Sequence, residues 1–272
     1  MKLISLNTFS ATFFEPFMQF VKQHAADTDI FCFQEVFHSH TGEVTATNER
    51  SNQLEELIAA LPEFNYYFAP VQENFAILGD GGTGFDYGNA TFIKKNLNVV
   101  GWDKIFIYRE ANSYVHGEFE TYPSNMLHTQ IMIGSKIVTV CNLHGAAMPG
   151  HKLDTVERLL QTKKILDFVR NEPGEKIIVG DFNLLPETRS IKLIEENGFR
   201  NLIQDFGITT TRGSLIKKLH PEYGTSAQGF QEFADYAFVS PGVVVTSFEV
   251  PDLPVSDHLP LILEFEVMGD SW

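Results

Sequence analysis

IIVGDFN, residues 177–183, is the stretch that decides how this chain is expected to fold. Its apolar residues run straight into Asp181 and Asn183, the pattern of a buried β-strand that emerges from a sheet with polar side chains at its end. If the extended conformation persists, strand alternation projects both side chains toward one face. The alternative is an ordinary Asp turn after the strand, with Pro186 starting a helix.

Four further motifs bring polar residues to the ends or starts of apolar runs. They are LISLN at 3–7, DIFCFQE at 29–35, TVCNLH at 139–144 and SDH at 256–258. An active site assembled from strand ends is what this order predicts. Oxygen donors dominate and there is no cysteine cluster, so the implied metal is Mg²⁺ or Mn²⁺ rather than structural zinc. The polar residues supplied by the five motifs are Asn7, Gln34, Glu35, Asn142, His144, Asp181, Asn183, Asp257 and His258.

The ordered set, together with DYAFV at 235–239, resembles the endonuclease/exonuclease/phosphatase superfamily, also called the deoxyribonuclease I-like fold. The resemblance spans Leu3 to about Phe265. It implies an α/β fold, a four-layer α/β sandwich of two packed mixed β-sheets flanked by helices. It also implies a divalent-metal-dependent hydrolase of phosphate esters.

Three residues are predicted to hold the metal. Glu35 follows an apolar strand, where an unpaired carboxylate is unfavourable unless it reaches water or a cation. Asn7 would orient the metal or a phosphate oxygen, and Asp257 would complete the metal shell or its water network. By resemblance, Asp181 orients or deprotonates the attacking water and Asn183 binds the phosphoryl group.

Histidines and one arginine complete the predicted site. His258 is expected to stabilise the phosphoryl centre, and the resemblance implies Asp235 as the carboxylate that sets its tautomer and pKa. His144 and Asn142 flank Leu143 and share a strand face. The resemblance implies that His144 contacts the scissile phosphate or assists the leaving group, and Asn142 is expected to bind substrate. Arg212 is expected to grip a substrate phosphate; a solvated surface loop is the alternative.

Two partners are less well defined by the sequence. His144 needs an orienting carboxylate, for which Glu73 is the candidate. Many relatives carry an arginine on the strand before the NxH strand, whereas this chain has SNMLHTQI at 124–131. His128 or Arg109 is expected to compensate, unless the substrate phosphate is held from elsewhere.

Size and composition limit the protein class. The candidate ligands run from Asn7 to His258, so we expect one domain over residues 1–272. The net charge is -15, and the sequence has no basic stripe. Both observations weaken the hypothesis that the protein binds nucleic acid. No apolar run approaches the roughly 20 residues of a transmembrane helix. The start, MKLISLNTFS, leaves no room for a signal peptide, so we expect a cytoplasmic protein, and Cys32 and Cys141 are expected to be free buried thiols.

Apolar periodicity predicts the secondary structure. Strands are expected at 3–7, 29–34, 90–94, 127–133, 136–143, 176–181, 235–239, 243–249 and 260–267. Helices are expected at Glu15–Ala25, Glu49–Ala60, Thr155–Arg170 and Glu187–Asn197. Loops are expected at 37–48, 79–88, 102–124 and 205–231, with GDGGTG at 79–84 as a flexible loop rather than a phosphate-binding one.

The predicted reaction is hydrolysis of a phosphate ester by in-line attack of water, without a covalent intermediate. Acidity favours a small or lipid-derived phosphoester as substrate. The alternative is a metal-dependent endo- or exonuclease acting on DNA, which leaves nucleic acid open as a partner. A catalytically silent binding module is a third reading, disfavoured because every expected catalytic position is filled. No obligate protein partner is evident.

Overall fold

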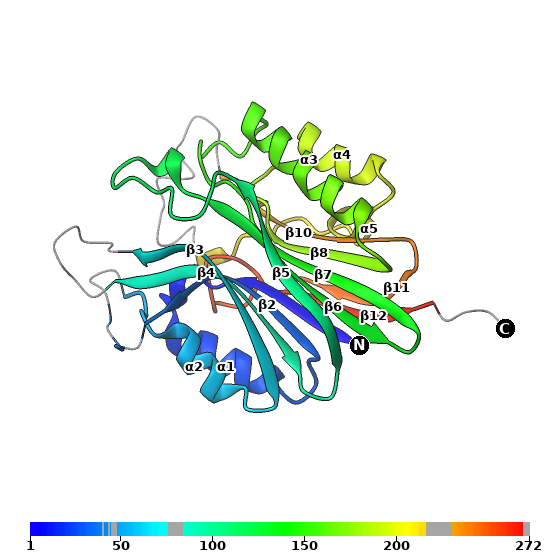
Figure 1. Ribbon diagram of the computed structural model, residues 1–272, viewed down its shortest axis with the longest axis horizontal. Helices are drawn as coiled ribbons and strands as arrows, with labels where there is room; N and C mark the ends of the chain where they lie inside the picture. The colour runs from blue at the N-terminus through cyan, green and yellow to red at the C-terminus, as the bar shows by residue number, and fades with distance from the viewer. Residues whose placement is uncertain (40, 43, 45–47, 76–83, 216–229, 269–272) are drawn as a thin grey trace.

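Two six-stranded β-sheets pack face to face in the computed structural model (Figure 1). The structure describes residues 1–39, 41–42, 44, 48–75, 84–215 and 230–268. Helices lie outside both sheets, so the layers run helix, sheet, sheet, helix. This confirms the predicted four-layer α/β sandwich.

The first sheet has the strand order β11-β12-β1-β2-β4-β3, and the second has the order β5-β6-β7-β8-β10-β9. The strands of the first are β1 (Lys2–Asn7), β2 (Ile30–His38), β3 (Phe64–Phe75), β4 (Phe85–Lys94), β11 (Val243–Glu249) and β12 (Leu261–Val267). Those of the second are β5 (Asn98–Tyr108), β6 (Ser124–Ile133), β7 (Lys136–His144), β8 (Glu175–Asp181), β9 (Arg200–Asn201) and β10 (Asp235–Val239). The pairs β1–β2 and β7–β8 are parallel and the other ladders antiparallel, so both sheets are mixed.

Each sheet has its own helices. The first is covered by α1 (Phe14–His24) and α2 (Gln53–Ala60), and the second by α3 (Val156–Asn171), α4 (Arg189–Glu196) and α5 (Leu202–Asp205) (Figure 1). Two short 3₁₀ turns, η1 (Phe9–Ala11) and η2 (Phe119–Thr121), lie in connections. Among the helices of the described residues, none has the length and apolarity to cross a membrane.

The apolar core has an inner and an outer part. Between the sheets, Leu3 and Ile30 of the first pack with Val140 and Ile178 of the second, and the free thiols Cys32 and Cys141 are buried there as predicted. Outside the first sheet, α1 packs on β2, with the Phe17 ring edge-on to the Phe33 ring. The continuous apolar strands are therefore explained by burial on both faces.

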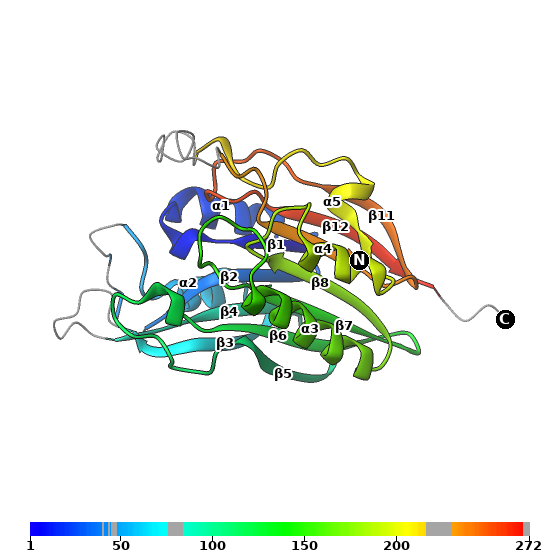
Figure 2. The same cartoon turned by 90° about the horizontal axis from the view of Figure 1, so that it is seen from above.

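Strand register gathers the sequence motifs at one edge of the sandwich. In the parallel ladders His144 lies opposite Asp181, so β7 and β8 end together, and β1 ends at Asn7, opposite Gln34 and next to the bulge of β2. The antiparallel β10 begins at the same edge, where Asp235 pairs with Asp181. From the far end of the chain, β12 returns beside β1 (Figure 2), which brings the preceding SDH segment to that edge too.

Several boundaries differ from the sequence prediction. Residues 102–108 belong to β5 rather than to a loop, β3 was not predicted, β4 begins at Phe85 rather than at residue 90, and α2 begins at Gln53 rather than Glu49. Both β3 and β5 are edge strands with register shifts, so their apolar alternation is broken. Of the predicted loops, residues 40, 43, 45–47, 79–83 and 216–229 lie outside the described residues.

Candidate active site

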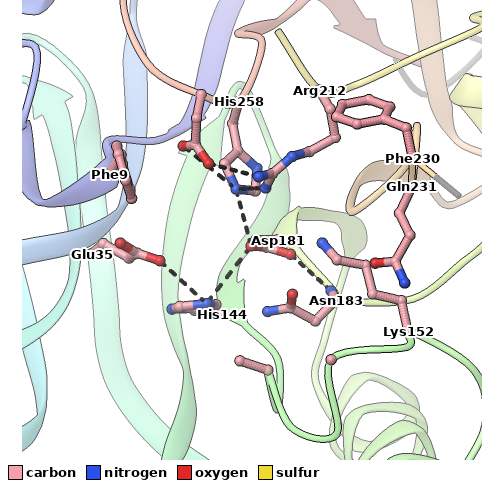
Figure 3. A pocket seen from close by; sticks show the side chains of 13 residues that line it. Phe9, Glu35, His144, Lys152, Asp181, Asn183, Arg212, Phe230, Gln231 and His258 are labelled. Carbon is pink, nitrogen blue, oxygen red and sulfur yellow. Dashed lines mark hydrogen bonds and ion pairs between the residues drawn. The ribbon is translucent and has the colours of Figure 1, made fainter. Parts of the chain in front are cut away.

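A cavity of about 450 Å³ opens at this edge and draws side chains from both sheets (Figure 3). It contains most of the predicted site residues, which come from five separate segments of the chain. The lining residues are Phe9, Glu35, His144, Ala147, Gly150, Lys152, Asp181, Asn183, Arg212, Phe230, Gln231, Asp257 and His258.

Glu35 reaches the cavity because β2 contains a bulge. Between the pairs Phe33–Ala90 and Val36–Gly88, β2 has one more residue than β4, and Glu35 there has φ 57. The extra residue keeps Phe33 and Val36 on the same apolar face and turns Glu35 out of the alternation. A left-handed backbone is unusual at a glutamate, so the surrounding structure must hold Glu35 in this conformation.

Two carboxylates converge on Asn7. Its Nδ2 donates to Glu35 Oε1 at 3.0 Å and to Asp181 Oδ2 at 3.1 Å, while its Oδ1 accepts from the backbone N–H of Phe9 at 3.0 Å. His144 Nε2 lies 3.8 Å from Glu35 Oε1 and 3.7 Å from Asp181 Oδ2. The two carboxylates therefore face one point, although Asn7 itself is fully buried beneath the cavity surface.

His258 forms a buried pair with Asp235. Its Nδ1 lies 2.8 Å from Asp235 Oδ2, and its Nε2 points toward Asp181 Oδ2 at 3.7 Å. Burial and the neighbouring Arg212 lower the pKa of His258, but the carboxylates of Asp235, Asp257 and Asp181 outweigh them and raise that pKa above its usual value. The predicted pairing of Asp235 with His258 is thus present in the structure.

Arg212 enters from the loop after α5 and is held against the SDH segment. An isolated β-bridge joins Arg212 to His258, and the Arg212 guanidinium donates to Asp257 Oδ2 at 2.6 Å and contacts the His258 ring. Asp257, predicted in the metal shell, is thus engaged in an ion pair. The two sequence candidates for a compensating cation lie elsewhere: His128 packs on the Phe168 ring under α3, and Arg109 is exposed beside Tyr108.

Asp181 and Asn183 share the cavity through a turn rather than through extended backbone. β8 ends at Asp181, and Asn183 has φ 53 and donates its backbone N–H to Asp181 Oδ1 at 2.8 Å. Phe182 between them is buried in the core. Burial alone would raise the pKa of Asp181, but the surrounding cationic groups, His258 first, lower it to about 2. Asp181 is therefore ionised at neutral pH.

His144 is oriented by a tyrosine rather than by the predicted Glu73. The Tyr87 hydroxyl lies 3.5 Å from His144 Nδ1, whereas Glu73 is exposed on β3 and contacts Asn112. Burial is the main cause that raises the pKa of Tyr87 well above its usual value, so the phenol keeps its proton. Tyr87 therefore offers a neutral hydrogen-bonding group to the ring.

Asn142 does not line the cavity. It shares a strand face with His144, as predicted, but sits two residues deeper, where β7 faces the first sheet. Its Nδ2 donates to the carbonyls of Phe33 and Ala90, at 3.2 and 3.0 Å, and its Oδ1 accepts from Gln34 Nε2 at 2.7 Å. Asn142 therefore ties the two sheets together below the site and does not face a substrate in the cavity.

The donor set fits a divalent cation with hard oxygen preference. Glu35 presents a carboxylate beside the amide of Asn7, and the Asp181 carboxylate faces the same point, where it can accept a hydrogen bond from water. A second group, Asp181, Asp235 and His258, has ligand atoms within 4.8 Å of one another, but there the carboxylate of Asp235 already accepts from the histidine. Oxygen donors of the first kind are those that Mg²⁺ and Mn²⁺ favour.

A sequence model of the Endonuclease/Exonuclease/phosphatase family matches residues 4–258. The chain belongs to this family. Members of the Endonuclease/Exonuclease/phosphatase family act as phosphatases, phosphodiesterases or nucleases, so membership supports an enzyme that hydrolyses phosphoester bonds. A search of curated proteins found no match.

Solved structures of the family share the fold. A Bacteroides vulgatus endonuclease/exonuclease/phosphatase is 19% identical with a TM-score of 0.68, over 98% of each chain. A mannosyl-6-phosphatase of Bacteroides thetaiotaomicron is 17% identical with a TM-score of 0.68, over 98% of this chain and 99% of that one. The human Nocturnin catalytic domain with bound sulfate is 16% identical with a TM-score of 0.68, over 98% of this chain and 93% of that one. At these identities the likeness concerns the fold alone.

Six residues that line the cavity belong to no predicted motif, and neither does Tyr87 beside it. The six are Phe9, Ala147, Gly150, Lys152, Phe230 and Gln231. A signal did exist for Lys152, because it follows the TVCNLH strand by eight residues in a strongly acidic chain. The others are placed by tertiary packing that no local pattern encodes.

Proposed function

We propose that this protein hydrolyses phosphate esters by in-line attack of water, with Mg²⁺ or Mn²⁺ held by Glu35, whose carboxylate Asn7 orients. One observation carries the proposal: Glu35 from the bulge of β2, His144 and Asp181 from the ends of β7 and β8, and His258 from the segment before β12 face a single cavity. Because both sheets supply this cavity, we propose further that the chain acts as one domain.

A divalent cation at this point would neutralise phosphoryl oxygens and the leaving oxygen. Glu35 would hold it, with Asn7 orienting the carboxylate. Asp257, the third predicted ligand, would act through the water network around the metal, since its Oδ2 already accepts a hydrogen bond from Arg212.

The protein's own groups do the rest of the chemistry. Asp181, ionised because its pKa is about 2, accepts a hydrogen bond from water and orients it, then takes the proton as the water oxygen bonds to phosphorus. Asp235 helps to raise the pKa of His258, and the His258 imidazolium stabilises the negative charge of the phosphoryl group in the transition state. His144 and Asn183 bind the remaining phosphoryl oxygens. Arg212 adds a cation at the same wall and keeps His258 and Asp257 in place.

The substrate we propose is a small or lipid-derived phosphoester. A net charge of -15 opposes broad contact with nucleic acid, and a cavity of about 450 Å³ suits a small ligand.

The test is a parallel assay of purified protein with Mg²⁺ or Mn²⁺, with and without EDTA. The substrates are p-nitrophenyl phosphate, bis(p-nitrophenyl) phosphate, sphingomyelin and plasmid DNA. We expect metal-dependent turnover of a small or lipid ester that EDTA abolishes. Preferred cleavage of plasmid would show that DNA, rather than a small or lipid ester, is the substrate. Turnover of none of the four substrates would contradict the proposal.

A further inference from the structure

The loop between β7 and α3 places a lysine against the cavity that the roles above leave unused. Lys152 lines the cavity with Ala147 and Gly150, and its side chain extends toward Asp181 and Asn183 (Figure 3). Its backbone has φ 54, in the left-handed region that lysine seldom adopts. A strained residue in the wall of a site indicates that the surrounding loop holds that residue in place.

Arg158 of α3 fixes this loop. Its side chain is fully buried and donates to the carbonyl oxygens of Ala146, Ala147, Pro149 and Leu153 at 2.7–3.1 Å. The carbonyl of Lys152 also accepts from the backbone N–H of Leu185 at 2.9 Å, which joins the loop to the turn that carries Asn183. The wall that presents Lys152 is therefore rigid.

The Lys152 ammonium has no anionic partner in the part of the chain that the structure describes. No described residue accepts a hydrogen bond from its Nζ, and no described carboxylate forms an ion pair with it. Arg212 differs, because its guanidinium already binds Asp257. An unpaired, partly buried cation is unfavourable until an anion arrives. Burial first, and then Arg212, lower the pKa of Lys152 to about 8, although the more distant carboxylates of Asp181, Asp235 and Asp257 act to raise it.

We propose that Lys152 binds a terminal phosphate oxygen and makes the enzyme select phosphomonoesters over phosphodiesters. The inference rests on the proposed function and names its substrate class. A monoester carries three terminal oxygens and up to two negative charges, whereas a diester carries two oxygens and one charge. The charge of Lys152 therefore favours the monoester. Because the loop is rigid, it does not move aside to make room for a second ester substituent.

The test compares kcat/KM on p-nitrophenyl phosphate and bis(p-nitrophenyl) phosphate for wild type, Lys152→Met and Lys163→Met. Lys163 is an exposed lysine of α3 and serves as the matched control. We expect wild type to prefer the monoester. Lys152→Met should lose about 30-fold or more on the monoester, the size of one charge-assisted hydrogen bond, and the ratio of monoester to diester should fall at least about tenfold.

A binding measurement separates this inference from the proposed function. Calorimetric titration with inorganic phosphate at pH 7 should show affinity at least about tenfold weaker in Lys152→Met than in wild type. If Lys152→Met fails to fold, Lys152→Gln takes its place in both assays. An unchanged ester ratio or unchanged phosphate affinity overturns the inference. Wild type that binds phosphate through Lys152 but hydrolyses none of the four substrates named above would refute the proposed function alone.

Discussion

Replacing Asp235 with asparagine removes the charge behind His258 and leaves the hydrogen bond in place. The two side chains are 3% and 5% exposed and their Oδ2 and Nδ1 atoms are 2.8 Å apart. At an effective dielectric constant of about 20, unit charges at that distance attract by about 6 kcal/mol, part of which desolvation offsets. Because asparagine still accepts the Nδ1 proton, we expect a net loss of about 3 kcal/mol, or about 100-fold in kcat.

The same substitution should also shift the pH dependence of kcat. The Asp235 carboxylate helps to raise the pKa of His258, so the imidazolium persists to higher pH in the wild type. If that cation holds charge in the transition state, activity is lost as pH rises through this pKa. In Asp235→Asn the pKa falls, so the alkaline loss of kcat should begin at lower pH.

The assay is steady-state hydrolysis of the best substrate between pH 5 and 10, with saturating metal. The control is Asp167→Asn, which changes an exposed carboxylate that pairs with Arg170 on α3. Thermal melting shows whether each variant is folded. A folded Asp235→Asn protein with kcat within threefold of wild type and an unmoved alkaline limb would refute the role assigned to this pair.

Three further predictions concern stability and accessibility. Arg158→Met removes a buried side chain that donates to several loop carbonyls, and should lower the free energy of unfolding in urea by about 3 kcal/mol; an unchanged midpoint would show that the loop holds itself. Gly180→Ala puts a Cβ 2.0 Å from the Leu143 carbonyl oxygen at φ 133, so we expect a loss above about 4 kcal/mol or no soluble protein, and a normal melting temperature would contradict this. Burial raises the pKa of Cys32 to about 12 and also raises that of Cys141, so neither thiol should react with Ellman's reagent at pH 8 until guanidinium unfolds the chain.

The parts of the fold that the sequence predicts well are those where one local pattern decides the outcome. β8 and β10 are continuous apolar runs buried on both faces, and each meets an aspartate at the edge of the sheet. The pairing of Asp235 with His258 came from the family resemblance rather than from a local pattern, and the structure contains that contact. Edge strands such as β5 are half-exposed and interrupted by register shifts, so their pattern is weak.

The parts that the sequence does not predict depend on contacts between distant segments. Nothing local reveals the bulge that turns Glu35 inward, since it exists only relative to β4. Arg212 reaches His258 through one β-bridge from a loop, which explains how a cation enters the site without an arginine on β6. Tyr87 takes the place predicted for Glu73 because β4, not β3, faces His144.

The most direct test of the central claim is the metal-dependent turnover of Asp181→Asn beside wild type. Calorimetric Mn²⁺ titration of both proteins shows whether metal binding survives the change. The account predicts that the variant still binds Mn²⁺ but loses at least about 100-fold in kcat/KM, because the group that orients the attacking water is no longer a carboxylate. Metal-bound Asp181→Asn with wild-type turnover, or wild-type turnover that persists in EDTA, would contradict it.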